Sequence, residues 1–336
     1  MTGLTDVRLD GDPALPPGRD AVPESLGRPR ERRMVPRADF GSYYGLPVLN
    51  EPTWQAHDIG GYLFLGGLAG ASSTLAAAAH LTGRPRLARA CKTAALCGVT
   101  GSLYALIHDL GRPGRFLNML RVFKVTSPMS VGTWILTAYG PQAGLAAATA
   151  LVPGPWPGVA RWATVGAGLL GPALATYTAV LISDTAVPAW HGGYREMPFL
   201  FAGSAAASAA GIGLLAAPLA EAAPARRAAV AGVAVELAAA AGMKHRLGTV
   251  AEPLRRGRAG RLLRLGQALS VTGALVGLTA GRRSRRAAVV AGAALLAGSV
   301  CTRFGVFEAG TASARDPRYT VEPQRARLTE EEDDTQ

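Results

Sequence analysis

Residues 59–79 have the sequence IGGYLFLGGLAGASSTLAAAA, a run without a single charged side chain. A second such run, MSVGTWILTAYGPQAGLAAATAL, follows at residues 129–151. Uncharged apolar runs of about 18 or more residues are typical of helices that span a membrane. The two runs therefore predict an all-α, polytopic membrane protein and exclude a soluble globular enzyme.

The composition of the whole chain agrees with this prediction. Of its 336 residues, 49% are hydrophobic and only 17% are charged, against about 25% charged in an average soluble chain. Three cysteines are too few for a disulfide framework. The formal net charge of +12 is better explained by basic loops that face anionic lipid than by nucleic acid, since no recognition motif accompanies it.

Two polar tails flank a central part with eight apolar spans. Residues 1–42 have no apolar region of a signal peptide, and we expect them to be disordered. Residues 306–336 form a polar tail with an acidic end. The eight spans are residues 57–81, 89–108, 129–152, 160–184, 197–219, 226–242, 262–280 and 286–303. The sixth is short and the eighth is weakly bounded, so a count of seven stays open.

An even number of spans places both termini on one side of the membrane, here called the terminal face. Near the membrane this face has the basic residues Arg112, Arg115, Arg121, Lys124, Arg195, Lys244, Arg246, Arg255, Arg256, Arg258 and Arg261. The opposite face has Arg84, Arg86, Arg89, Lys92, Arg161, Arg226, Arg227, Arg282, Arg283, Arg285 and Arg286. With the flanking tails added, the positive-inside rule slightly favours cytoplasmic termini.

Ionisable side chains gather at the span ends on the terminal face. The group consists of His57, Asp58, His108, Asp109 and Asp184. Acids near the membrane core are costly unless they have a partner or a function, although residues at helix ends also cap helices or extend to the interface. As a group they indicate a functional site.

Two further residues lie deeper in their spans. Glu236 is about 10 Å inside the end of its span, at 1.5 Å per residue, and either pairs with a buried polar group or belongs to a proton path together with Asp184. Tyr177 lies two helical turns deeper than Asp184. Its hydroxyl either donates a hydrogen bond to a bound carbonyl or belongs to a packed aromatic.

Other sequence signals concern helix starts, helix contacts and cofactors. Ser127-Pro128 predicts the start of a helix, and Gly66 and Gly70 predict a close helix contact. The chain has no CxxC, Walker, GxSxG or HExxH motif, so we expect no iron–sulfur cluster of its own. Haem ligation by His57 and His108 remains an alternative.

Several motifs in a fixed order resemble the NrfD / polysulfide reductase membrane-anchor (PsrC-like) family. They are Tyr44–Pro47, Trp54, Tyr62–Gly70, the His-Asp-Leu-Gly-Arg-Pro loop from His108 to Phe116, Thr126–Trp134 and Tyr177–His191. The resemblance is strong over residues 43–205 and rests only on hydropathy beyond them.

The resemblance implies a subunit of eight helices in two four-helix bundles, here residues 43–205 with the quinone site and residues 206–305. It implies quinone or quinol as bound substrate and neither haem nor an iron–sulfur cluster in this chain. It also implies two partners, a four-cluster ferredoxin-like iron–sulfur subunit and a molybdopterin catalytic subunit. A formate dehydrogenase-like enzyme in the cell membrane is our expectation for the complex.

The resemblance also assigns roles to residues. Tyr177 matches the family's quinone-site tyrosine, Tyr62 occupies a position where related sequences can have histidine, and Asp109 lies in the polar loop beneath the iron–sulfur subunit. We therefore expect quinone binding by Tyr177, Tyr62, His57, Trp54 and Arg112. Proton exchange is assigned to Asp109, His108 and Asp58, because quinol oxidation needs groups that accept protons.

Three other functions remain open. An ion-coupled transporter or proton channel would use Glu236 and Asp184, but broken helices and internal repeats are not evident. A cytochrome b-type anchor would show a haem absorption spectrum. A purely structural anchor would bind no quinone.

Overall fold

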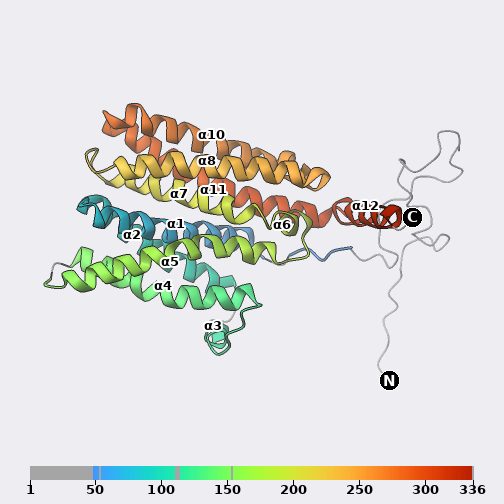
Figure 1. The fold of residues 1–336 in the computed structure, drawn as a ribbon, viewed down its shortest axis with the longest axis horizontal. Coiled ribbons are helices and arrows are strands. Elements are labelled where there is room, and N and C mark those ends of the chain that lie inside the picture. The colour runs from blue at the N-terminus through green and yellow to red at the C-terminus, as the bar shows by residue number, and fades with distance from the viewer. Residues whose placement is uncertain (1–47, 53, 110–113, 153, 335–336) are drawn as a thin grey trace, which may run out of the picture. The chain divides into compact units, whose positions relative to one another are not determined.

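The computed structural model describes residues 48–52, 54–109, 114–152 and 154–334, which form helices and no strand (Figure 1). Eight helices in this part of the chain have 20 or more residues, and each corresponds to one predicted apolar span. They are α1 (Ala56–Leu81), α2 (Pro85–Asp109), α4 (Pro128–Leu151), α5 (Pro157–Ser183), α7 (Met197–Ala216), α8 (Ala223–Arg246), α10 (Gly257–Leu278) and α11 (Arg285–Arg315). The shorter elements are α3 (Gly114–Met119), α6 (Pro188–Gly192), η2 (Gly248–Ala251), α9 (Glu252–Arg255), η3 (Ala280–Arg282) and α12 (Arg318–Asp334).

Five of the described helices, α1, α2, α5, α7 and α11, are long and apolar enough to cross a membrane. The prediction of an all-α, multi-pass membrane protein is therefore confirmed. Helices α4, α8 and α10 have 22 to 24 residues but do not meet the same measure of length and hydropathy. In α8 and α10 the cause is visible in the sequence, because both contain several Arg or Lys residues.

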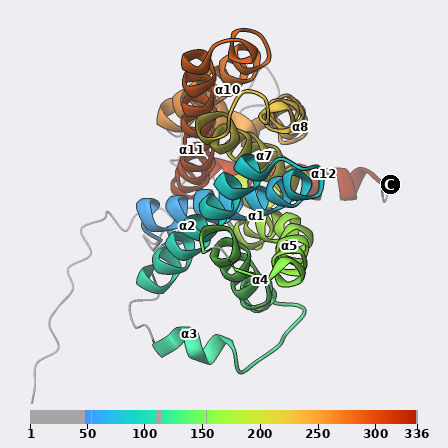
Figure 2. The same cartoon turned by 90° about the vertical axis from the view of Figure 1, so that its left-hand side faces the viewer.

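Consecutive long helices run antiparallel, so the first residues of α1 and α4 lie at the same end as the last residues of α2 and α5 (Figure 1). Helix α1 packs against α2, α5 and α7, while α4 packs against α5 and α8 against α7. In the end-on view of Figure 2, α1, α2, α4 and α5 lie together below α7, α8, α10 and α11.

Small residues let the helices approach closely, as Gly66 and Gly70 predict. A Cβ atom on Gly70 would collide with the backbone oxygen of Gly171 in α5, and one on Gly66 would lie 3.3 Å from Ser102 Oγ in α2. Van der Waals contact between backbones replaces the hydrophobic effect, which supplies little attraction between helices surrounded by lipid.

Buried hydroxyl groups add hydrogen bonds between the helices. The Tyr139 hydroxyl in α4 donates to the Ala69 carbonyl of α1 at 2.8 Å and is 2.7 Å from the Ser73 hydroxyl. In the other group of helices, the hydroxyls of Ser204 in α7 and Ser299 in α11 are 2.8 Å apart. Such bonds fix which helix faces which, because an unpaired hydroxyl in an apolar interior is costly.

The described chain divides into two compact units. Pro52–Ser313 contains the long helices. The other unit joins the residues before Pro52 with Ala314–Gln336, and in it Arg315 Nε lies 3.0 Å from Glu51 Oε2. Most of the predicted C-terminal tail is helical, with residues 306–315 in α11 and 318–334 in α12. The predicted disorder of residues 1–42 concerns residues outside the described part.

Candidate functional site

A hydrogen bond between Asp58 and His108 joins the first turn of α1 to the last turn of α2. Asp58 Oδ2 lies 2.9 Å from His108 Nδ1 and 3.7 Å from His57 Nε2. Helix α1 begins at Ala56, and an acid in its first turn is favoured by the positive end of the helix dipole. The Asp58 side chain is 11% exposed, whereas that of His108 is 55% exposed. The pair therefore connects a buried carboxylate to an imidazole at the surface.

Two neighbours of this pair restrict its geometry. The ring of Tyr104, one turn before His108 on α2, stacks on the imidazole with centroids 6.0 Å apart. The Asp109 carboxylate interacts with the charge of Asp58 and is hydrogen-bonded to the backbone of Gln55. The structure thus brings four of the predicted residues, His57, Asp58, His108 and Asp109, together at one end of α1 and α2. Arg112 lies outside the described residues.

Two buried tyrosines lie next to the pair of Asp58 and His108. Tyr62 is one helical turn from Asp58 on α1, and its ring meets the ring of Tyr177 from α5 edge to face at 6.4 Å between centroids. Tyr62 is 3% exposed and Tyr177 is 8% exposed. Edge-to-face pairs of this kind add about 0.5–1.5 kcal/mol beyond area burial. Helices α1 and α5 therefore hold both rings in fixed positions.

Helix α4 provides space for the Tyr177 ring. It begins at Pro128, with the Ser127 side chain accepting a hydrogen bond from the Ser130 N–H, as the Ser-Pro pair predicts. One turn later Gly132 faces Tyr177, and a Cβ atom there would overlap the ring. No described residue donates to or accepts from the Tyr177 hydroxyl. That hydroxyl is therefore an unpaired donor on a largely buried side chain, available to a ligand.

The connection before α4 is ordered by hydrogen bonds. The Ser130 hydroxyl donates to the Val122 carbonyl at 3.0 Å and accepts from the Lys124 N–H at 3.0 Å. The Trp134 indole donates to the same carbonyl at 3.3 Å. A cavity of about 200 Å³ lies beside these residues.

Trp54 lies in a separate aromatic cluster. Its ring stacks on Trp190 of α6 at 5.9 Å, and Trp190 in turn contacts Phe307 of α11 at 5.5 Å. The buried Trp190 indole donates to the Val306 carbonyl at 2.9 Å. No described contact joins Trp54 to the two tyrosines, so the structure does not bring this predicted residue to them.

Glu236 and Asp184 lie in different surroundings. Asp184 is exposed at the end of α5. Glu236 in α8 is 1% exposed, and its Oε1 accepts a hydrogen bond from the Thr302 hydroxyl of α11 at 2.6 Å. It also interacts with the charge of Arg303. The structure therefore separates the two residues of the predicted proton path.

Sequence reasoning missed Arg303. Its guanidinium is fully buried, donates to the Phe201 carbonyl at 2.7 Å and lies 3.7 Å from the centre of the Phe201 ring. A Cβ atom on Gly67 of α1 would lie 2.9 Å from its Nη2. The sequence places Arg303 at the end of the last predicted span, where an arginine looks like a boundary residue. The signal that could have identified Arg303 as buried was Glu236, an acid inside another span that needs a partner.

Comparisons with known proteins agree with the resemblance found in the sequence. The family model described as Polysulphide reductase, NrfD matches residues 47–245, which is more than half of the chain and includes α1 to α7 and nearly all of α8. A comparison with curated proteins found no match. The chain therefore belongs to the NrfD (polysulphide reductase) family and is a multi-pass membrane subunit of a quinone-linked oxidoreductase.

Proposed function

We propose that this chain binds quinol or quinone beside Tyr62 and Tyr177 and exchanges its electrons with an iron–sulfur subunit. The observation that carries the proposal is the hydrogen bond between Asp58 and His108, one helical turn from the buried tyrosine pair. A quinone site needs hydrogen-bond donors for the ring oxygens and groups that exchange protons with water. The free hydroxyl of Tyr177 and the exposed imidazole of His108 provide these two functions.

The proposed reaction transfers two electrons and two protons. Oxidation of one quinol to quinone releases two electrons and two protons. The Asp58 carboxylate accepts a proton from the quinol hydroxyl, and His108 passes it to water at the terminal face. Asp109, beside Asp58, accepts the second proton. The electrons leave toward a cluster in the partner subunit, and reduction of quinone runs through the same groups in reverse.

We propose the same architecture for the membrane part as the resemblance implies. All eight long helices cross the membrane, with α1, α2, α4 and α5 as the bundle of the quinone site and the other four as the second bundle. The iron–sulfur subunit binds at the terminal face, followed by a formate dehydrogenase-like molybdopterin subunit. The termini face the cytoplasm, and this chain holds neither haem nor a cluster.

Paired substitutions test the quinone site in the purified complex. Tyr177→Phe removes the free hydroxyl and Asp109→Asn removes a proton acceptor, and we expect each to lower kcat/KM for quinol by roughly tenfold or more. Tyr139→Phe is the matched control, because Tyr139 is also buried in the same group of helices but bonds only to α1. It is expected to lower thermal stability by about 1 kcal/mol and to leave the KM for quinol unchanged.

Unchanged quinol affinity and turnover in both Tyr177→Phe and Asp109→Asn would contradict this assignment. A haem absorption spectrum of the purified chain would instead favour the cytochrome b-type anchor.

Proton transfer across the membrane is a second candidate function, favoured by one observation. Glu236 Oε2, Arg303 Nη1 and Ser270 Oγ are buried without a hydrogen-bond partner among the described residues. Buried ionisable groups in membrane helices commonly mark proton paths. Arg303 also lies against Gly67 of α1, about 8 Å along that helix from Tyr62 at 1.5 Å per residue. Glu236 could therefore respond to the charge at the quinone site.

Vesicles that contain the whole complex test this second function. We expect Glu236→Gln to lower the number of protons moved per electron while quinol oxidation in detergent continues. Glu252→Gln, which removes a partly exposed acid, is the control. An unchanged proton-to-electron ratio in Glu236→Gln would exclude Glu236 from the path and leave it a structural partner of Thr302 and Arg303.

A further inference from the structure

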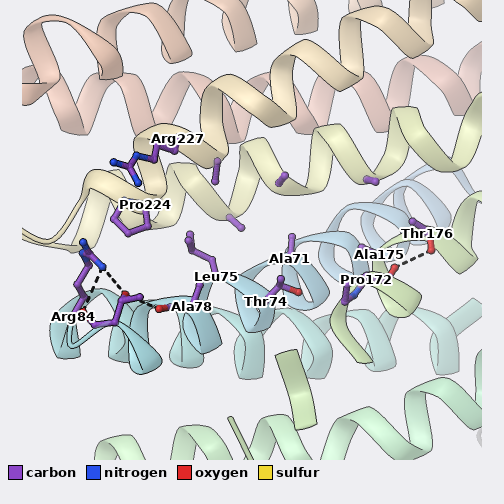
Figure 3. A pocket seen from close by; sticks show the side chains of 15 residues that line it. Ala71, Thr74, Leu75, Ala78, Arg84, Pro172, Ala175, Thr176, Pro224 and Arg227 are labelled. Carbon is purple, nitrogen blue, oxygen red and sulfur yellow. Dashed lines mark hydrogen bonds between the residues drawn. The ribbon is translucent and has the colours of Figure 1, made fainter. Parts of the chain in front are cut away.

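A cavity of about 540 Å³ lies between α1, α5, α7 and α8 (Figure 3). Its walls consist mostly of alanine, leucine and proline side chains, among them Leu75, Ala78, Pro172 and Ala206. Exposed residues such as Ala78 and Pro172 show that the cavity opens sideways, toward the space that lipid occupies around a membrane protein.

The threonine hydroxyl groups in the cavity wall already have hydrogen-bond partners in the protein. Thr74 donates to the Gly168 carbonyl at 3.1 Å, and Thr176 donates to the Pro172 carbonyl at 2.8 Å. The long part of the cavity therefore presents hydrocarbon to any occupant. Along α1 it extends from Thr82 to Ala71, about 16 Å at 1.5 Å per residue. This length is about half of a 30 Å hydrocarbon core, the depth of one lipid leaflet.

Two arginines lie at the opposite-face end of the cavity. Figure 3 shows Arg84, from the connection between α1 and α2, and Arg227, from the first turns of α8, on either side of Pro224. The Arg84 guanidinium is held by the Thr82 hydroxyl at 2.5 Å. No described carboxylate pairs with either arginine. The end of the apolar cavity therefore has two positive charges without a negative partner.

The nearest acid on this face is engaged elsewhere. Glu221 Oε2 accepts hydrogen bonds from the backbone N–H groups of Arg86 and Leu87 at 2.8 and 3.0 Å, and so caps the start of α2. Other basic residues lie on the same face, including Arg226 and Arg285. The face therefore favours an anionic group from outside the protein, and arginine binds phosphate with paired, charge-assisted hydrogen bonds.

We propose that the cavity binds one anionic phospholipid, with its phosphate on Arg84 and Arg227 and an acyl chain along α1 toward Ala71. A neutral apolar molecule would fill the hydrocarbon part but would gain nothing from the two arginines. The lipid contacts α1 and α5 on one wall and α7 and α8 on the other, and so fills the space between helices that meet directly elsewhere.

Native mass spectrometry of the full-length chain in nanodiscs tests this proposal. Nanodiscs contain phosphatidylglycerol, phosphatidylcholine or an equal mixture of both. We expect the wild-type chain to retain one phosphatidylglycerol from the mixture. The double substitution Arg84→Gln and Arg227→Gln should weaken this binding by at least about tenfold. The matched control, Arg86→Gln with Arg283→Gln, removes two arginines of the same face that do not line the cavity, and should change binding less than twofold.

A second variant tests the apolar part. Ala78→Phe places a large ring in the cavity from an exposed position, and we expect it to displace the bound lipid while both arginines remain. Thermal unfolding of the same nanodisc preparations reports that each variant is folded. Equal retention of phosphatidylcholine and phosphatidylglycerol, or retention of phosphatidylglycerol by the double variant, would overturn the proposal. Bound quinone that is insensitive to the arginine substitutions would assign the cavity to a quinone tail instead.

Discussion

Asp58 lies at the centre of the candidate site. Its carboxylate is buried, bonds to His108 across the α1–α2 interface and lies one helical turn from Tyr62. A buried carboxylate without a hydrogen-bond partner is costly. The bond therefore connects a group near the tyrosines to an imidazole that is open to water.

Gly132 sets the position of the Tyr177 ring, and we predict that Gly132→Ala raises the KM for quinol severalfold. The added methyl group overlaps the ring, so the ring or α4 must move. Overpacking of this kind costs about 1–3 kcal/mol. The measurements are steady-state quinol oxidation and thermal unfolding of the same preparation.

Gly140→Ala on the same helix is the matched control. A Cβ atom there meets nothing within 4 Å, and alanine is the better helix former by about 0.5–1 kcal/mol. This variant should keep the wild-type KM and be equally or more stable. If both alanine variants behaved alike, Gly132 would have no special role at the site.

Single residues also show what the sequence could not predict. The grouping of His57, Asp58, His108 and Asp109 followed from span ends, since each span end fixes the height of a residue in the membrane. The ring that Trp54 contacts could not be predicted from the positions of the span ends. Hydropathy says nothing about which residues of other helices lie opposite, and Trp190 and Phe307 come from 136 or more positions farther along the chain.

At the scale of elements, an ion pair joins the start of α7 to the end of α8. Arg246 forms two hydrogen bonds with the Glu196 carboxylate, at 2.7 and 2.5 Å, and one with the Gly192 carbonyl at 2.6 Å. These bonds hold the pKa of Glu196 below its usual range. The pair lies at the terminal face, where it fixes the connection that contains α6.

We predict that this ion pair makes stability depend on pH in the acidic range. Because the folded-state pKa of Glu196 is lowered, the stabilisation is full above the unfolded value of about 4.3 and is lost as the pH falls through the lower folded value. Both side chains are partly exposed, so the contribution is at most about 1 kcal/mol. Thermal unfolding of wild type and Glu196→Gln between pH 3 and 6 measures it.

The difference between the two proteins should shrink toward the acidic end. Glu252→Gln, which breaks an exposed pair with Arg256, is the control and should show a smaller difference. A constant difference between wild type and Glu196→Gln over the whole range would contradict the prediction.

Element boundaries were predictable except where tertiary contacts override local sequence. The starts of α1, α4 and α7 lie within one residue of the predicted spans. Helix α11 instead continues twelve residues past the predicted end at Arg303. An arginine inside a span is costly unless it is paired, and here Glu236 and the Phe201 carbonyl compensate it. The short helices α3, α6 and α9 carry no periodic signal of their own.

At the scale of the whole molecule, composition was enough to predict the class. Apolar runs, small residues and basic loops all indicate a helical membrane protein, and the described helices agree. The pairing of helices was not predictable, because it depends on close backbone contacts such as Gly70 with Gly171 and on buried hydroxyls such as that of Tyr139. These residues are too common in the chain to indicate which helix each one faces.

The neighbourhood of Glu236 and Arg303 has a consequence for biosynthesis. Helix α8 is translated before α11, so the acid is made ahead of its basic neighbour. A lone arginine near the centre of a helix costs about 2.5–3.5 kcal/mol during insertion. When α11 leaves the ribosome, Glu236 is already in place to offset this cost. We therefore expect membrane integration of α11 to depend on α8, a helix made earlier.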